Sequence, residues 1–121
     1  MGNIKTALIV DDSSFMRTFI GKLISDQGLT VVGEAENGKI GVEKYKELKP
    51  DIVFMDIVME EMMGFEALKE IIEYDPDAVV IMISSAVEQD YMAGQAKSLG
   101  AKAVVLKPPT PKDIEEALAG L

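Results

Sequence analysis

Apolar residues in this chain form short continuous runs, and the runs alternate with longer segments in which apolar residues recur every three or four positions. Four of the runs are apolar throughout, which is typical of strands buried on both faces of a sheet. The longer segments carry their apolar residues along one face, which predicts amphipathic helices. The predicted strands are residues 7–10, 30–34, 51–55, 79–83 and 103–106, and the apolar faces of the predicted helices span 15–24, 40–48, 65–72, 91–99 and 114–121.

Capping and breaking residues stand at the expected ends of these helices. Asp12 or Ser13 can cap the first helix, and Gly28 stands where a left-handed residue would end it. Pro50 prevents the second helix from continuing. The last helix is entered through Thr110 and a following proline, which the first helical turn tolerates. The end signals therefore agree with the apolar periodicity.

The alternation of strand and helix, repeated five times, predicts an α/β fold. Because strands buried on both faces must be covered on both sides, we expect helices on each face of one parallel sheet. Right-handed crossovers leave few topologies, and we predict the doubly wound, flavodoxin-like (βα)5 arrangement with a five-stranded parallel sheet of order 2-1-3-4-5. A length of 121 residues fits one domain, so residues 1–121 are expected to form it.

The amino-acid composition limits the kinds of chemistry that this chain can perform. The chain has no cysteine and no histidine, so a metal would need oxygen ligands, as Mg²⁺, Mn²⁺ and Ca²⁺ do. A net charge of −9, with Arg17 as the only arginine, argues against nucleic-acid binding by the chain itself. No apolar run approaches the roughly 20 residues of a membrane span. We expect a soluble cytoplasmic protein that does not bind membranes.

Polar residues follow several of the predicted strands, at the edge where such a sheet binds its ligands. Asp56 follows the third strand, where its carboxylate avoids the cost of burial without a partner. In the order 2-1-3-4-5, the ends of the first, third, fourth and fifth strands lie together. The polar residues at these ends are Asp11, Asp12, Asp56, Ser84, Ser85 and Lys107.

Three carboxylates at one edge repel one another and stay ionised together only around a cation. Mg²⁺ accepts oxygen ligands and often lies between carboxylates and a phosphate. A carboxylate can itself be the nucleophile of phosphoryl transfer, and we interpret Asp56 as the phosphorylated residue. Asp11 and Asp12 would then bind Mg²⁺. Ser85 and Lys107 would bind the phosphoryl group through a hydroxyl and a positive charge.

Each of these residues also has a simpler explanation. Asp11 and Asp12 could only cap the first helix. Ser85 could be an ordinary loop hydroxyl, and Lys107 a solvated surface lysine. A shared site is favoured because all of them follow predicted strands at one edge, an argument that depends on the predicted topology.

Five pieces of the chain together form a specific pattern. They are Leu8–Arg17, Glu34–Gly38, Pro50–Ile57, Ser85–Ala86 and Lys107–Pro108. In this order and at these spacings they resemble the receiver domain of two-component response regulators, most closely the single-domain chemotaxis receivers. The resemblance implies transfer of a phosphoryl group to Asp56 from a phosphohistidine on a histidine kinase or phosphotransfer protein. It implies no enzyme activity beyond the receiver's own phosphorylation and dephosphorylation, and a cis peptide bond before Pro108 that directs Lys107 inward.

The resemblance also implies a set of metal ligands. Mg²⁺, with Mn²⁺ as an alternative ion, would bind Asp11, Asp56 and the backbone carbonyl of Val58. Asp12 would act mostly through water.

Several positions depart from the usual pattern of the family. Glu60 stands where a proline is usual, and Met63 where Asn or Asp usually precedes the glycine. Val104 replaces an aromatic residue that rotates inward in many receivers, so we expect the switch to be muted or read out otherwise. Val58 and Val87 are apolar, and we expect them to shield the phosphoryl group from water and slow its hydrolysis.

Phosphorylation would change binding to a protein partner, because 121 residues leave no room for an output domain. The partner could be a component of the flagellar motor switch, an adaptor or a phosphotransfer protein. One alternative is a degenerate receiver that binds partners without phosphorylation, and another is a receiver excised from a multidomain regulator. An aspartate-nucleophile phosphatase is disfavoured because neither Asp11 nor Asp56 is followed by a second aspartate two residues later. A flavodoxin is disfavoured because the acidic pair after the first strand would repel a flavin phosphate.

Overall fold

The strands form one parallel sheet in the order β2-β1-β3-β4-β5, which confirms the predicted doubly wound, flavodoxin-like α/β fold. The computed structural model describes residues 4–59, 62–85 and 89–121. In chain order the elements are β1 (Thr6–Val10), α1 (Ser14–Asp26), β2 (Thr30–Ala35), α2 (Gly38–Leu48), β3 (Ile52–Asp56), α3 (Gly64–Tyr74), β4 (Val80–Ser84), α4 (Gln89–Ser98), β5 (Ala103–Leu106) and α5 (Pro111–Ala119). Within these described ranges, none of the helices combines the length and the apolar character that crossing a membrane requires.

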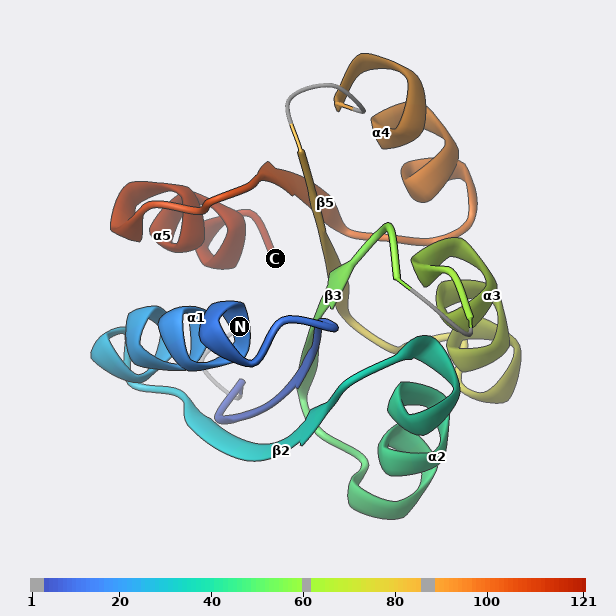
Figure 1. Ribbon diagram of the computed structural model, residues 1–121, viewed down its shortest axis with the longest axis horizontal. Helices are drawn as coiled ribbons and strands as arrows, with labels where there is room; N and C mark the ends of the chain where they lie inside the picture. Colours follow the sequence, from blue (N-terminus) through green and yellow to red (C-terminus); the bar gives the residue numbers. More distant parts are fainter. Residues whose placement is uncertain (1–3, 60–61, 86–88) are drawn as a thin grey trace.

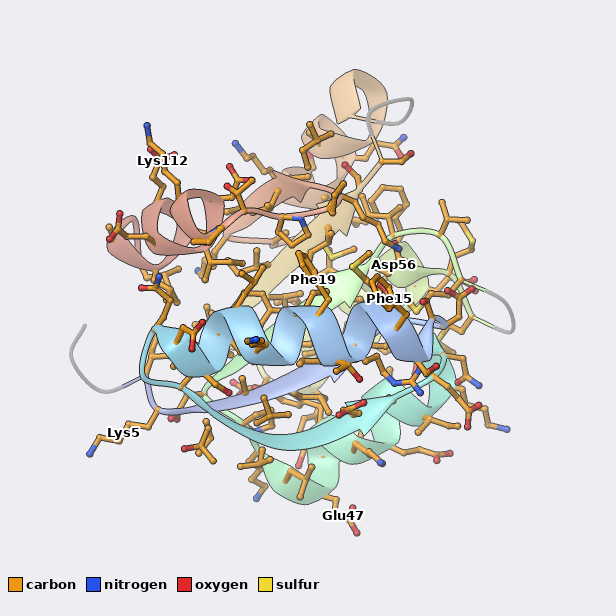
Figure 2. The ribbon with its side chains drawn as sticks, turned by 60° about the vertical axis from the view of Figure 1, so that its left-hand side comes forward. Lys5, Phe15, Phe19, Glu47, Asp56 and Lys112 are labelled. Carbon is orange, nitrogen blue, oxygen red and sulfur yellow. The ribbon has the colours of Figure 1, made fainter. Side chains whose placement is uncertain are left out.

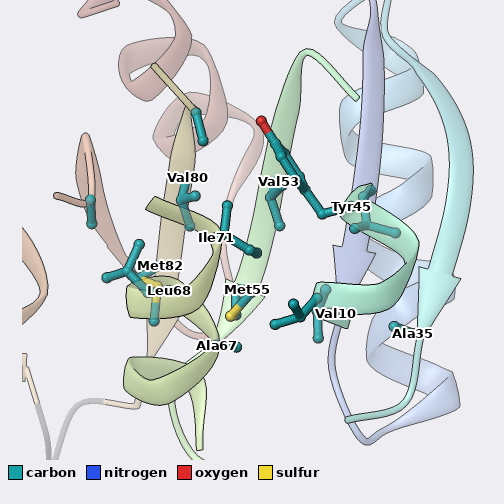
Figure 3. Close-up of a cluster of buried hydrophobic side chains, with 14 of the residues drawn as sticks. Val10, Ala35, Tyr45, Val53, Met55, Ala67, Leu68, Ile71, Val80 and Met82 are labelled. Atoms are coloured by element: carbon teal, nitrogen blue, oxygen red, sulfur yellow. The ribbon is translucent and has the colours of Figure 1, made fainter. Parts of the chain in front are cut away.

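Helices α1 and α5 cover one face of the sheet, and α2, α3 and α4 cover the other (Figure 1). Successive residues of each strand point to opposite faces, so every inner strand contributes to two hydrophobic cores. Val53 and Met55 of β3 pack with Leu68 and Ile71 of α3 in the core on the α2–α4 side (Figure 3). Phe54 belongs to the core on the α1–α5 side. This double burial is the physical reason for the continuous apolar runs in the sequence.

The helix ends agree with most of the capping predictions. Ser13 caps α1 by accepting a hydrogen bond from the Met16 N–H at 3.1 Å, and Gly28 has a φ of +91° just after that helix. Two details differ. Lys49, a non-glycine residue, ends α2 with a φ of 48°. The last helix ends at Ala119, so Leu121 lies beyond it and not on its apolar face as predicted.

Hydrogen bonds of Asp51 link the start of β1 to the start of β3, at the end of the sheet opposite the predicted site. Its Oδ2 accepts hydrogen bonds from the N–H groups of Lys5 and Thr6 at 2.8 and 3.0 Å. Its own N–H donates to the hydroxyl of Thr6 at 2.9 Å. The bonds from Lys5 and Thr6 hold the pKa of Asp51 below its usual value. These bonds help to set the register between the two strands whose far ends carry the acidic residues.

The start of α3 lacks an efficient cap. Met63 occupies the N-cap position, and its own side chain makes no capping hydrogen bond. Glu66 reaches back to the Met63 N–H, but at 3.4 Å. Because an N-cap acceptor satisfies an otherwise unpaired helix N–H, this position is a weak point in the segment that leads away from β3.

Asparagine at this position is expected to stabilise the protein. Met63→Asn should exceed Met63→Ala in free energy of unfolding by about 1 kcal/mol, because both lose the methionine side chain and only asparagine can cap α3. Urea denaturation of the two variants measures the difference. Equal stabilities would show that α3 gains nothing from a capping side chain.

Candidate functional site

The carboxyl ends of β1 and β3 place two aspartates beside each other. The register pairs Val10 with Met55, so the residues that follow them, Asp11 and Asp56, are neighbours at the edge of the sheet. The end of β4 adjoins them, since Asp56 is in register with Ile83. Figure 2 shows Asp56 at this edge, near the end of α1 that carries Phe15. The convergence of strand ends that the topology predicted is present in the structure.

Lys107 bridges the two aspartates. Its Nζ lies 3.1 Å from Oδ2 of Asp11 and 3.1 Å from Oδ2 of Asp56, where it also donates a hydrogen bond. The aspartate side chains are only 1% and 7% exposed, whereas that of Lys107 is 23% exposed. Lys107 directly follows β5, and its N–H donates to the carbonyl oxygen of Ser84 at 2.6 Å. The peptide bond between Lys107 and Pro108 is cis, as the resemblance implied.

Burial and neighbouring charges shift the pKa values of Asp56 and Lys107. Desolvation, reinforced by the charge of Asp11, raises the pKa of Asp56 from 3.8 to about 6, against the opposing effect of Lys107. Burial by itself would lower the pKa of Lys107, but Asp56 and Asp11 outweigh it and raise that pKa above 10.5. One ammonium therefore does not fully compensate the carboxylates, and a further cation would relieve the excess negative charge.

The acidic cluster suits a divalent cation. One carboxylate oxygen from each of Asp11, Asp12 and Asp56 lies within 4.8 Å of the other two. Oδ1 of Asp11 accepts a hydrogen bond from the Ser13 N–H at 2.9 Å, whereas its buried Oδ2 accepts no hydrogen bond from the part of the chain that the structure describes. Its contact with Lys107 is an ion pair. A buried carboxylate oxygen left without a hydrogen bond and three oxygen donors at this spacing fit Mg²⁺.

The other predicted site residues lie around this cluster or outside the described residues. Ser85 is half-buried and directly follows β4. Val58 lies just beyond β3 and is 46% exposed, and Val104 of β5 packs half-buried against the core on the α2–α4 side. Val87 and Glu60 fall outside the described residues. The phosphoryl contact of Ser85, the Val58 carbonyl as a ligand, and the effects of Val104 and Val87 on switching and lifetime remain predictions.

Two further residues shape the site, although the sequence reasoning assigned them no role in it. A Cβ at Gly64 would collide with the backbone oxygen of Asp56, so α3 can begin against the end of β3 only because residue 64 lacks a side chain. Arg17 contacts the main chain of Asp11, to whose carbonyl oxygen its Nη1 donates at 2.7 Å. The available signals were the glycine at the start of a helix and the position of the single arginine shortly after the acidic pair.

A comparison with protein families agrees with this geometry. Residues 7–119 match the family described as the response regulator receiver domain. The chain belongs to this family. A response regulator receiver is a signalling domain, and the grouped aspartates and the lysine of this receiver lie within the matched residues.

Individual relatives narrow the kind of receiver. This receiver is similar to the chemotaxis protein CheY of Thermotoga maritima, with 51% identity over 114 residues that cover 94% of each protein. It is 52% identical to the chemotaxis protein CheY of Bacillus subtilis over 101 residues, 84% of this chain and 83% of that protein. Among solved structures it resembles the CheX–CheY–BeF3–Mg²⁺ complex from Borrelia burgdorferi, with a TM-score of 0.88 and 33% identity, over 94% of this chain and 86% of that chain. The chain is thus a CheY-like receiver.

Proposed function

We propose that Asp56 of this receiver accepts a phosphoryl group from a phosphohistidine of a histidine kinase or phosphotransfer protein in a Mg²⁺-dependent reaction. The observation that carries the proposal is the position of Asp56, buried at a strand end and paired with a lysine that it shares with Asp11. A carboxylate that is buried, crowded by like charge and next to a cation is prepared for a reaction that brings in more negative charge. The proposal treats residues 1–121 as one receiver domain and places the protein in the cytoplasm.

The residues of the site would divide the work of phosphoryl transfer. A carboxylate oxygen of Asp56 forms the bond to phosphorus while the bond between phosphorus and the imidazole nitrogen of the donor breaks, and the released imidazole takes up a proton. Lys107 moves its hydrogen bond from Asp56 to an oxygen of the bound phosphoryl group, and Ser85 donates to another. The chain catalyses only its own phosphorylation and dephosphorylation.

A divalent ion would be held by Asp11, Asp12, Asp56 and the backbone carbonyl of Val58. When bound, Mg²⁺, or Mn²⁺ in its place, supplies the positive charge that offsets the carboxylates and the phosphoryl oxygens. The fit rests on the spacing of the three carboxylate oxygens and on the buried Oδ2 of Asp11.

The output of the switch would be a protein partner. The related CheY proteins are named for chemotaxis, and the similar Borrelia burgdorferi structure is a complex of CheY with CheX. We therefore place this receiver in chemotaxis signalling, with a kinase or phosphatase acting on it and a motor-switch component or adaptor reading its state. Phosphorylation biases two packings of the loops around Asp56 and Ser85, and the partner binds one of them better.

Intact-mass measurement after incubation with acetyl phosphate and Mg²⁺ tests the proposal. The wild-type protein is expected to gain one phosphoryl group, and Asp56→Asn none. Asp77→Asn, a change of the same kind at an exposed position outside the site, should be phosphorylated like the wild type. Chelation of the Mg²⁺ should abolish the adduct in both. An unmodified wild-type protein would instead support the degenerate receiver, which the grouped Asp11, Asp56 and Lys107 do not favour.

A further inference from the structure

Arg17, the only arginine of the chain, links α1 to the ends of two strands. Its Nη1 donates to the main-chain carbonyl oxygen of Asp11 at 2.7 Å, just beyond β1. Its Nε donates to Oε1 of Glu34, near the end of β2, at 3.0 Å. The Arg17 side chain is 17% exposed, and that of Glu34 is 48% exposed. The guanidinium thus lies partly buried between a backbone acceptor and a carboxylate.

The hydrogen bond from Arg17 is one of three that hold Asp11 in place. The N–H of Asp11 donates to the carbonyl oxygen of Ala35 at 3.0 Å. Its carbonyl oxygen accepts from Arg17, and its Oδ1 accepts from the N–H of Ser13 at 2.9 Å. The remaining polar atom, the buried Oδ2, contacts Lys107, and the carboxylate as a whole belongs to the acidic cluster. Every other polar group of the residue is therefore held by a hydrogen bond within the fold.

A lysine could not make the two contacts of Arg17 in this geometry. The guanidinium is planar and presents its N–H groups in a fixed fork, so one group can reach a carbonyl while another reaches a carboxylate. An ammonium is a point charge on a flexible chain and would satisfy one acceptor at the expense of the other. Lys44 already donates to the carbonyl oxygen of Glu34 at 2.6 Å, which anchors the same residue from α2.

We propose that Arg17 is a positioning residue for the divalent-cation site, because its guanidinium holds the Asp11 peptide in the orientation that presents the Asp11 carboxylate to the other two. This inference rests on the proposed function, since it requires that the cluster binds Mg²⁺. Two effects of removing Arg17 oppose each other. Loss of a positive charge would favour the metal, but Glu34 already compensates that charge at 3.0 Å. Loss of the fixed orientation would weaken binding and is the larger effect.

Calorimetric titration with Mg²⁺, without a phosphodonor, separates these effects. Arg17→Lys keeps the charge and loses the fork, whereas Arg17→Gln loses both. We expect each variant to bind Mg²⁺ about ten-fold more weakly than the wild type, in line with residues that orient metal ligands elsewhere. Lys44→Met is the matched control, because it removes a cation that contacts Glu34 but not Asp11, and its affinity should stay within about two-fold.

The possible outcomes distinguish this inference from the proposed function. If the wild type binds Mg²⁺ and Arg17→Lys binds it equally well, or if Arg17→Gln binds it more tightly, Arg17 acts only through its charge and the inference is overturned. If the wild type itself does not bind Mg²⁺, both the inference and the metal site of the proposed function are overturned. A merely structural role would lower the melting temperature in EDTA and leave the affinity of the folded protein for Mg²⁺ unchanged. If Arg17→Gln does not fold, Arg17→Lys carries the test.

Discussion

Lys107→Met is expected to lower the free energy of unfolding of the metal-free protein by about 2 to 4 kcal/mol at pH 8. Methionine keeps much of the length and the apolar stem of lysine and removes the ammonium that lies 3.1 Å from both Asp11 and Asp56. Two carboxylates that are almost fully buried would then face each other without a cation. Removal of one partner from a buried ion pair is costly because the remaining charge has neither water nor a counter-ion.

Urea denaturation in EDTA measures this loss, and Lys112→Met is its matched control. Lys112 forms an exposed pair with Glu116 at 4.0 Å, so its replacement should change the free energy of unfolding by less than about 0.5 kcal/mol. Combining Lys107→Met with Asp56→Asn should recover much of the loss, because one buried charge is removed with its partner. Similar losses in the Lys107 and Lys112 variants would argue against a special role for the buried cluster.

The metal-free wild-type protein is expected to become more stable as the pH falls from 8 to 5, by about 1 to 3 kcal/mol. Burial raises the pKa of Asp56 from 3.8 to about 6, so the folded state takes up a proton at a pH where the unfolded state does not. The stabilisation is therefore fully present below pH 3.8 and is lost as the pH rises through about 6. The chain contains no histidine, so no histidine titration overlaps with this range.

Asp56→Asn tests the assignment of this pH dependence. The variant lacks the titrating group, so its stability should be nearly constant between pH 5 and 8 and should exceed that of the wild type at pH 8. The contribution of Asp51 to stability has the opposite pH dependence, because the pKa of Asp51 is lowered in the folded state. That contribution falls only when the pH drops below the usual aspartate pKa of 3.8. A pH dependence that survives in Asp56→Asn would have to be assigned to another group.

The elements that could be predicted from sequence are those with a strong local signal. The continuous apolar run of β3 and the caps at Ser13 and Thr110 predicted their elements close to the observed bounds. The left-handed Lys49 at the end of α2 was missed because a lysine carries no preference for that conformation. The end of α5 was placed too late, since Leu121 continues the apolar spacing although the helix has already ended.

The site was predictable as a group of residues but not as an arrangement of atoms. The position of polar residues after parallel strands indicated that Asp11, Asp56 and Lys107 would meet. No pattern in the sequence indicated that Lys107 contacts both aspartates, because 51 positions separate it from Asp56 and the contact depends on tertiary packing. The contact of Arg17 with the Asp11 carbonyl was equally hidden, because it depends on how α1 lies against the end of β1.

By itself the sequence determined the order of strands and helices, the double burial of the inner strands, and the polar residues that follow each of them. These properties depend on residue spacing along the chain, which periodicity reads directly. Only the tertiary structure decided the shared ion pair, the burial of Oδ2 of Asp11, the close approach of Gly64 and the raised pKa of Asp56. These depend on strand register and on distances of a few ångströms between distant segments, since Coulomb energies, hydrogen bonds and steric contacts change steeply over such distances.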